Sequence, residues 1–229
     1  MKLSVVIPVY NERQTVELLL KRVEATPYEK EIILVDDAST DGTREILERL
    51  AYDHRDQVRL FVHPANRGKG AAIRTAIEQV TGDIVIIQDA DLEYDPRDYP
   101  ALLEPILEDQ ADVVFGNRFH GGPHRVLYFW HHVGNRFLTN LCNVVTNLNL
   151  SDIEVGYKVF RTDVLQRLRL KSDRFGIEPE LTVKVAKLGC RIYEVPIAYH
   201  GRTYAEGKKI TWRDGLAALY CILRFRLFD

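Results

Sequence analysis

Two stretches of this sequence share one pattern: EIILVDD at residues 31–37 and DIVIIQDAD at residues 83–91. In each stretch, a short run of large apolar residues ends directly at acidic side chains. A run that is apolar throughout is typical of a strand whose two faces are both covered. The pattern therefore predicts buried strands of a parallel sheet, with carboxylates where the strands end.

More strands and several helices are predicted around these stretches. Short apolar runs occur at residues 3–9, 58–62 and 112–115, and apolar residues at helical spacing fill the intervals. This alternation predicts an α/β fold with a Rossmann-like, mostly parallel sheet flanked by helices. Ligands of such sheets bind outside the carboxyl ends of the strands. Polar clusters follow the strands at residues 36–37, 66–70, 89–93 and 116–118.

Capping and breaking residues set the expected helix boundaries. The first helix is expected to be capped by Asn11, and the second by Ser39 or Thr40. Asp98 is expected to cap a later helix, and Pro105 inside that helix is expected to kink it.

The second half of the chain has a different composition. Residues 119–135 are rich in glycine, histidine and aromatic residues and are interpreted as a loop. The histidines there, His120, His124, His131 and His132, lack a firm ligand spacing, so no metal site is predicted from them. Later elements are expected at residues 137–145 (helix), 156–161 (strand), 180–188 (helix), 191–195 (strand) and from 211 onward (helix). No repeat or low-complexity linker divides residues 1–229, which predicts a single domain.

Composition and charge count against several classes of protein. The chain has 229 residues with a formal net charge of −2, so no broad basic surface is expected to bind nucleic acid. No apolar run reaches the roughly 20 residues of a membrane span, and the first run is interpreted as a strand rather than a signal peptide. The three cysteines form no CxxC pair. They are interpreted as reduced thiols, which favours a cytoplasmic location.

The acids of Asp89-Ala90-Asp91 are the sharpest candidates for a metal site. Both directly follow a predicted buried strand, so they are expected to point into one cleft at the edge of the sheet. Mg²⁺ and Mn²⁺ prefer oxygen ligands and often bind substrate phosphates as well. Glu93 can add a third carboxylate. The alternative is that these acids are solvated loop or helix-capping residues.

Two other clusters are candidates for nucleotide binding. Asp37 can accept a hydrogen bond from a ribose hydroxyl or a base N–H, with Asp36 supporting it, or one of the two can cap the next helix. Residues 66–70 (NRGKG) offer backbone N–H groups, a helix N-terminus and two cations to an anion. Neither GxxxxGK[ST] nor GxGxxG occurs, which counts against a P-loop protein and a nicotinamide-dependent oxidoreductase.

Five motifs resemble glycosyltransferase family 2, a large inverting family with the GT-A fold. In chain order they are VVIPVYNE, EIILVDDASTDGT, NRGKGAA, DADLEYDP and GNR, and they cover about residues 1–120. Scattered later residues, Asp152, Gly156-Tyr-Lys, Arg202 and Gly207-Lys-Lys, are similar to the dolichol- or polyprenyl-phosphate mannose and glucose synthases. The resemblance implies a metal-dependent transfer of a hexose from a nucleotide-diphosphate sugar of the GDP-mannose or UDP-glucose type.

The resemblance also implies which residues bind the donor, within a nucleotide-sugar-binding half at residues 1–118. Pro8, Tyr10 and Glu12 would contact the nucleoside, Asp37 would bind the base, and Lys69 would lie near the nucleotide. The metal, Mg²⁺ or Mn²⁺, would be held on the diphosphate by the turn of Asp89, Ala90 and Asp91, with Glu93 as a further ligand.

Residues 119–229 would form the acceptor-binding half. Arg118, at the boundary, would face the acceptor phosphate or the donor diphosphate, and Asp152 would organise the acceptor site. Arg202, Lys208 and Lys209 would close over the phosphates from a mobile loop. The histidine-rich segment, with Arg125, Phe129 and Trp130, would be a mobile acceptor loop, and His200 would touch the metal or a phosphate or be an ordinary strand-end residue.

The nature of the acceptor decides whether a base is needed. A phosphate monoester has a second pKa of about 6 and is already nucleophilic at neutral pH. A sugar hydroxyl needs a carboxylate within hydrogen-bond reach. The candidates are Asp152, Glu154, Glu178 and Glu180. For the last two, the alternative is that their charge favours a helix N-terminus.

The segment 211–228 combines apolar positions with Arg213, Arg224 and Arg226. A basic amphipathic helix can lie on the cytosolic face of a membrane. Packing on the body of the protein or on a partner subunit is the alternative.

The leading hypothesis is transfer to a polyprenyl- or dolichyl-phosphate-like lipid. One rival keeps the donor and gives the sugar to a hydroxyl of a glycan, glycolipid or small molecule. A rival of another class is a non-catalytic module that binds nucleotide sugars. A nucleotidyltransferase is disfavoured because the first strand–helix turn, PVYNERQT, is not glycine-rich.

Overall fold

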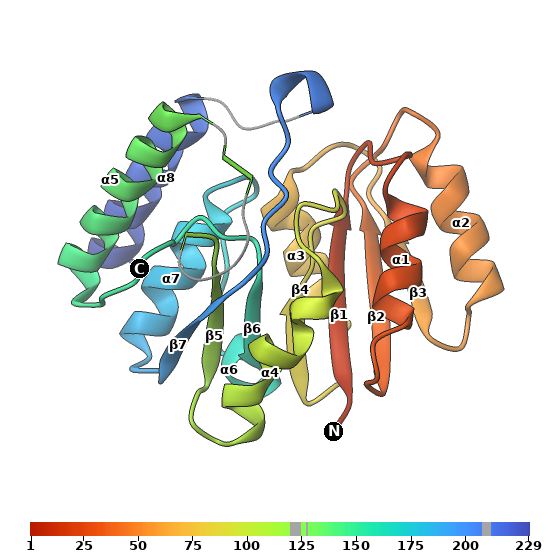
Figure 1. The fold of residues 1–229 in the computed structure, drawn as a ribbon, viewed down its shortest axis with the longest axis horizontal. Coiled ribbons are helices and arrows are strands. Elements are labelled where there is room, and N and C mark those ends of the chain that lie inside the picture. Colours follow the sequence, from red (N-terminus) through yellow and green to blue (C-terminus); the bar gives the residue numbers. More distant parts are fainter. Residues whose placement is uncertain (120–124, 127, 208–211) are drawn as a thin grey trace.

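A seven-stranded sheet forms the centre of the computed structural model, which describes residues 1–119, 125–126, 128–207 and 212–229 (Figure 1). The strands lie in the order β3-β2-β1-β4-β6-β5-β7, and only β6 runs antiparallel to its neighbours. The strands are β1 (Leu3–Val9), β2 (Lys30–Asp36), β3 (Val58–Val62), β4 (Ile84–Ile87), β5 (Val113–Asn117), β6 (Lys158–Arg161) and β7 (Ile192–Pro196). The predicted α/β fold with a mostly parallel sheet is confirmed.

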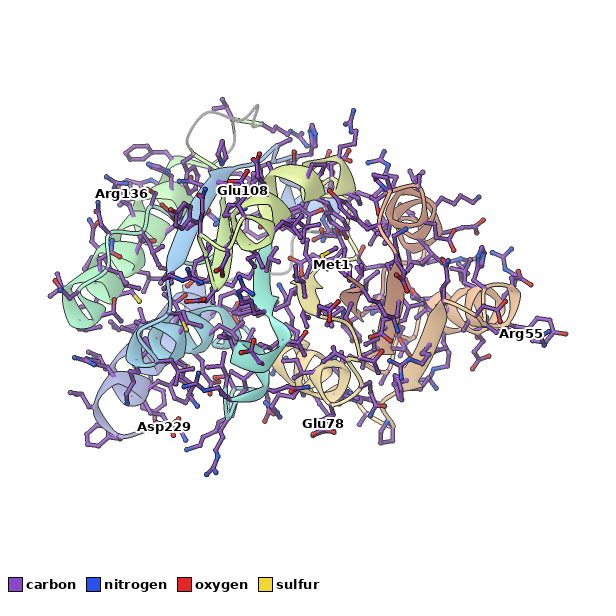
Figure 2. All side chains as sticks on the ribbon, turned by 90° about the horizontal axis from the view of Figure 1, so that it is seen from below. Met1, Arg55, Glu78, Glu108, Arg136 and Asp229 are labelled. Atoms are coloured by element: carbon purple, nitrogen blue, oxygen red, sulfur yellow. The ribbon has the colours of Figure 1, made fainter. Side chains whose placement is uncertain are left out.

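Helices cover both faces of the sheet. Glu108, which follows α4, and Glu78, which follows α3, lie on opposite sides of it in Figure 2. The α-helices are α1 (Val16–Glu24), α2 (Thr43–Asp53), α3 (Lys69–Ile77), α4 (Tyr99–Leu107), α5 (Phe129–Thr146), α6 (Thr162–Gln166), α7 (Ile177–Lys187) and α8 (Trp212–Leu227). Short 3-10 helices are η1 (Pro96–Asp98) and η2 (Tyr204–Glu206).

The apolar runs form the central strands because helices exclude water from both faces. Every residue of β2, β4 and β5 is buried, including the charged ends of β2. In the register, Val9 pairs with Asp36 and Val6 pairs with Ile87. The acids that follow β2 and β4 therefore leave the sheet at the same edge, as the parallel arrangement predicts.

The expected caps of the first two helices are wrong. Asn11 has a left-handed backbone (φ 52°), and its side chain accepts a hydrogen bond from the N–H of Thr40 at 2.8 Å. Ser39 in turn accepts from the N–H of Asn11 at 2.9 Å. These polar residues join the loops after β1 and β2 to each other, so α1 begins later, at Val16, and α2 begins after Gly42.

Asp98 stands at the N-cap of α4 but makes no capping hydrogen bond, because its carboxylate accepts from the N–H of Ala198 at 3.0 Å. Pro105 lies inside α4. In both cases the position was predicted, but the partner of Asp98 lies in the second half of the chain.

The second half adds two antiparallel ladders and a pair of long helices. The expected loop is shorter than predicted: Phe129, Trp130, His131 and His132 lie in the first turn of α5. This helix packs beside α8 at one end of the molecule (Figure 1). The short helix α6 was not predicted, because five residues are too few to show a period.

The described helices include none that is long and apolar enough to cross a membrane. Cys142, Cys190 and Cys221 are free thiols, as expected.

Candidate active site

Gln88 fixes the point at which the chain leaves β4. Its buried side chain accepts hydrogen bonds from the hydroxyls of Tyr99 (3.0 Å) and Tyr157 (2.6 Å) and donates to the carbonyl of Asp89 (2.9 Å). A buried amide with both ends satisfied holds one position. Asp89 and Asp91 therefore start from a fixed backbone at the edge of the sheet.

Lys69 links Asp89 to the second half of the chain. Its ammonium lies 2.7 Å from the carboxylate of Asp89 and 2.8 Å from that of Glu178, which is on the first turn of α7. Burial by itself would lower the pKa of Lys69, but the two carboxylates outweigh it and raise the pKa above its usual value. Lys69 is therefore a fixed cation at the N-terminus of α3.

Arg202 holds Asp91, the other expected metal ligand. Its guanidinium lies 2.7 Å from Asp91 and 3.2 Å from Glu12, a buried acid of the loop after β1. Burial, and then the charges of Asp89 and Glu93, raise the pKa of Asp91 to about 7. The carboxylates of Asp89 and Glu93 therefore disfavour the charged form of Asp91, while the guanidinium of Arg202 favours it.

Glu93 is held by the segment that carries Arg202. One of its oxygens accepts from the hydroxyl of Tyr199 at 3.0 Å and the other from the N–H of Arg202 at 2.8 Å. The carbonyl of Glu93 accepts from the N–H of His200 at 2.9 Å. In this arrangement Glu93 anchors the 199–202 segment, and the exposed side chain of His200 lies outside these contacts.

The residues at this edge fit a hard divalent cation. Four carboxylates gather there with the two cations Lys69 and Arg202: Glu12, Asp89, Asp91 and Glu93. Within the described part of the chain, no three potential ligands are already grouped around one point. Mg²⁺ needs only one or two protein carboxylates when substrate phosphates and water complete its shell. Asp89 and Asp91 can supply those oxygens.

Arg118 and Asp152 form a buried pair beside this cluster. The guanidinium donates two hydrogen bonds to the carboxylate, at 2.6 and 2.7 Å, and Asn135 of α5 donates a third at 3.0 Å. Burial by itself would raise the pKa of Asp152, but the charge of Arg118 and these hydrogen bonds lower it. The guanidinium also stacks on the ring of Tyr199, 5.1 Å from its centroid.

The backbone of Gly156 packs directly against Asp89. A Cβ at position 156 would lie 2.2 Å from the Oδ2 of Asp89. The N–H of Gly156 donates to the hydroxyl of Tyr94 at 2.9 Å, which fixes this approach. The segment before β6 therefore forms one wall of the site, and only glycine fits there.

Asp36 and Asp37 both fix loops. Asp37 accepts from the backbone N–H groups of Arg67 (2.9 Å) and Gly68 (2.7 Å) and contacts His63 at 2.7 Å. Asp36 accepts from the N–H of Ser39 at 3.1 Å and pairs with a surface arginine. Asp37 shapes the loop that carries Lys69, and its expected contact with a base stays a prediction.

The first loop reaches the metal-site turn. The Oγ1 of Thr15 lies 2.8 Å from the carbonyl oxygen of Ala90 and 3.0 Å from the carboxylate of Glu12, so its one proton can bond to either oxygen. Pro8 lies in β1 and Tyr10 follows that strand at the same edge of the sheet. Their expected contacts with a nucleoside stay predictions.

Two predicted substrate-binding residues are held by contacts that do not include Asp89 or Asp91. Arg125 pairs with Glu206 at 2.8 Å. Glu180 is completely buried and accepts from the N–H groups of Lys171 (2.8 Å) and Ser172 (2.7 Å), so it fixes a loop. Four other residues fall outside the described residues: His120, His124, Lys208 and Lys209.

Three residues that the sequence did not single out as donor-site partners also contribute. Glu178 pairs with Lys69, Tyr199 holds Glu93, and Tyr94 holds Gly156. In the sequence, Glu178 stood out only as an acid at the start of a predicted helix. Acids are common at any helix N-terminus, so this signal did not indicate a partner.

A family model described as "Glycosyl transferase family 2" matches residues 4–169. The Undecaprenyl-phosphate mannosyltransferase of Micrococcus luteus is 32% identical over 252 residues, 99% of each chain. The Low-salt glycan biosynthesis hexosyltransferase Agl6 of Haloferax volcanii is 31% identical over 218 residues, and this chain spans only 51% of that protein.

Solved structures share the fold. The glucosyl-3-phosphoglycerate synthase of Mycobacterium tuberculosis, in complex with Mn²⁺, UDP and phosphoglyceric acid, has a TM-score of 0.76 over 100% of this chain and 79% of that chain, at 20% identity. The same enzyme with Mg²⁺ and UDP has a TM-score of 0.72, over 98% of this chain and 79% of that chain, at 21% identity. At this identity the likeness establishes the architecture.

Proposed function

This chain belongs to glycosyltransferase family 2, and we propose that it transfers a hexose, with inversion, from a nucleotide-diphosphate sugar to the phosphate of a polyprenyl-type lipid. The arrangement of Asp89 and Asp91 between Lys69 and Arg202 carries this proposal. It concentrates both signs of charge at one edge of the sheet, where a diphosphate and its metal ion need them.

The donor half of the reaction needs neutralisation of the leaving group. The bond between the anomeric carbon and the diphosphate oxygen breaks, and its electron pair stays on the nucleoside diphosphate. A Mg²⁺ or Mn²⁺ ion held by Asp89 and Asp91 would supply Lewis-acid stabilisation of that charge. Lys69 and Arg202 add fixed positive charge on either side, which stabilises the leaving group without reorganisation.

Arg202 and Lys69 are both paired with acids, and these pairs fix the direction of each cation. A guanidinium held by Asp91 and Glu12 keeps further N–H groups that can point toward a phosphate. The same holds for the ammonium of Lys69, which has three N–H donors and two carboxylate partners. Each cation is therefore oriented before the donor arrives.

The acceptor half is supported by the Arg118–Asp152 pair. A phosphate monoester attacks the anomeric carbon through an oxygen that is already ionised near neutral pH, so no side chain has to remove a proton. Arg118 lies beside the metal-site acids and carries a charge that suits a phosphate, while Asp152 and Asn135 fix its direction. The name of the Micrococcus luteus relative points to the same class of acceptor.

The surfaces of α5 and α8 favour a lipid acceptor. Each helix carries a stripe of exposed apolar residues at helical spacing, in addition to the face that it buries. The stripes are Trp130, Val133, Phe137 and Val144 on α5 and Leu216, Tyr220, Leu223 and Leu227 on α8. Arg136, Arg224 and Arg226 are exposed on the same helices. Apolar and basic residues together suit peripheral contact with an anionic membrane.

A transfer assay tests the proposal. Purified protein receives GDP-mannose or UDP-glucose labelled in the sugar, with Mn²⁺ or with a chelator, and either a short polyprenyl phosphate or the matching polyprenol. Metal-dependent labelling of the phosphate alone supports the proposal. Labelling of the polyprenol or of simple sugars alone would show that a hydroxyl is the acceptor.

Transfer to a hydroxyl is the second candidate function, because the site contains a carboxyl that could act as a base. Glu154 lies two residues before Gly156 in the chain, and its buried Oε1 has no hydrogen-bond partner among the described residues. Donor turnover that stops in a Glu154→Gln variant with a hydroxyl acceptor would favour this second function.

A further inference from the structure

His63 is a buried histidine whose two ring nitrogens both have a partner. It directly follows β3 and is only 4% exposed. Its Nδ1 lies 2.7 Å from the Oδ1 of Asp37, and its Nε2 lies 2.9 Å from the hydroxyl oxygen of Thr75 on α3. The backbone N–H of His63 donates to the carbonyl of Asp36 at 2.8 Å. A buried ring with both nitrogens engaged is held in one position.

The contact with Asp37 decides which nitrogen of His63 carries a proton. An ionised carboxylate only accepts hydrogen bonds, so Nδ1 has to be the donor to Asp37. The hydroxyl of Thr75 suits either state of Nε2, because a hydroxyl can donate or accept. A free neutral imidazole can hold its proton on either nitrogen, and here the neighbouring acid selects Nδ1. His63 is therefore a fixed donor to Asp37.

Asp37 passes this constraint to the loop before α3. Its Oδ1 also accepts from the N–H of Arg67 at 2.9 Å, and its Oδ2 accepts from the N–H of Gly68 at 2.7 Å. Successive backbone N–H groups of this kind form a concave site for an anion. The sequence predicts these N–H groups as donors to an anionic ligand, but in the structure an acid of the chain itself accepts from both.

The position of Gly68 sets the start of α3 and so the direction of Lys69. Gly68 is the N-cap of α3 and has a φ of 98°, which favours glycine. It also packs tightly on a neighbouring loop, because a Cβ at position 68 would lie 2.5 Å from the carbonyl oxygen of Asp173. Lys69 is the next residue, and its ammonium lies 2.7 Å from Asp89 and 2.8 Å from Glu178. A loop fixed in this way leaves Lys69 one direction.

We propose that His63 is a positioning residue for the sugar-nucleotide donor. Its proton on Nδ1 fixes Asp37, and Asp37 fixes the loop at residues 66–68. This loop in turn holds Lys69 beside Asp89. A cation that is already oriented stabilises the leaving diphosphate without having to reorganise during the reaction. The inference rests on the proposed function, because Lys69 and Asp89 belong to the proposed donor site.

Two variants of His63 separate the Nδ1 donor from the bulk of the ring. The amide nitrogen of Asn can take the place of Nδ1 and donate to Asp37, whereas Leu fills space and has no donor. Calorimetry with GDP and with UDP, each with Mn²⁺, measures donor binding. We expect His63→Leu to weaken it by about tenfold or more, and His63→Asn to stay within about threefold of wild type. Equal binding by the two variants would overturn the proposal.

His54→Leu is the matched control for these measurements. His54 lies at the C-terminal end of α2 and pairs with Glu24 at 2.7 Å, so it is also a histidine in contact with an acid. Its replacement should leave nucleotide binding unchanged.

A double-mutant cycle tests whether the effect of His63 passes through Lys69. Lys69→Met removes the ammonium and keeps an unbranched side chain. If His63 acts by holding Lys69, His63→Leu should weaken nucleotide binding by less than about threefold in the Lys69→Met background. A merely structural role predicts the same loss in both backgrounds, and that additive result would refute the proposal.

Nitrogen NMR tests the arrangement without any substrate. In wild type at neutral pH, the Nδ1 of His63 should carry a proton. The ammonium of Lys69 should give a sharp signal in wild type and in His63→Asn and a broadened one in His63→Leu. An unprotonated Nδ1, or a Lys69 signal that is the same in all three proteins, decides against the proposal even if no nucleotide binds. If both NMR results hold but no sugar reaches a lipid phosphate, the role of His63 stands and the proposed acceptor fails.

Discussion

The guanidinium of Arg202 lies 2.7 Å from the carboxylate of Asp91, although 111 residues separate them in the chain. This contact brings the segment after β7 onto the turn after β4, and Glu93 fixes it there through the N–H of Arg202. The proposed donor site is thus built from both halves of the chain, and its positive and negative groups are mutually oriented.

The metal assignment predicts a severe loss on changing Asp91. Asp91→Asn keeps the size of the side chain but removes the charge that binds a hard cation, so metal-dependent transfer should fall by about a hundredfold or more. Mn²⁺ binding in the presence of nucleoside diphosphate, measured by calorimetry, should weaken in parallel. Unchanged turnover with unchanged Mn²⁺ binding would refute the role of Asp91.

Gly156→Ala should displace the side chain of Asp89 while leaving its carboxylate group in the protein. The added Cβ would lie 2.2 Å from the Oδ2 of Asp89, so the carboxylate has to move. We expect transfer to fall by about tenfold or more, because catalytic geometry tolerates little displacement. Gly134→Ala on α5 is the control, since a Cβ there meets nothing within 4 Å. Equal activity of the two variants would contradict the close approach.

Asp152→Asn should lower the stability of the protein as well as its transfer activity. The variant leaves the largely buried guanidinium of Arg118, 12% exposed, without its counter-charge. Breaking one partner of a fully buried pair typically costs about 3–5 kcal/mol, which is the upper end of the expected loss. Urea unfolding measures this loss. The exposed pair of Glu17 and Arg49 provides the comparison, and Glu17→Gln should leave the unfolding midpoint nearly unchanged. Similar midpoints for the two variants would show that the buried pair contributes little.

The lowered pKa of Glu31 should make the stability of the fold sensitive to acid. Burial by itself raises the pKa of Glu31, but hydrogen bonds from Ser4 and Thr81 and the charge of Lys2 outweigh it and lower the pKa to about 2. Its contribution is therefore present above its unfolded pKa, near 4.5, and is lost as the pH falls toward 2. The melting temperature of Glu31→Gln should be lower at neutral pH and should converge on that of wild type in acid. A constant difference would argue against this account.

The exposed stripe of α5 predicts binding to anionic vesicles. Trp130 and Phe137 are 77% and 61% exposed, so replacing both by Glu should spare the core and weaken co-sedimentation with anionic vesicles by about tenfold or more. Tyr52→Glu, at a residue 76% exposed on α2, is the matched control. Equal binding of the double variant and the control would place membrane contact elsewhere.

Much of the fold and part of the site could be predicted from local pattern. The apolar run of β4 and the two acids after it predicted a buried strand that delivers Asp89 and Asp91 to one edge of the sheet, because strand burial and strand direction are local consequences of the sequence. The caps were missed because Asn11 and Ser39 bond across two loops, and a partner 28 residues away leaves no local signal.

The sequence by itself determined the alternation of strands and helices in the first half of the chain, the acids at the strand ends and the family resemblance, since these depend on residue type and spacing along the chain. Only the tertiary structure decided that Lys69 meets Glu178, that Arg202 meets Asp91 and that the buried Oε1 of Glu154 has no hydrogen-bond partner among the described residues. Such pairings depend on distances between remote segments, and the charge state of each buried group depends on which other charges burial brings near it.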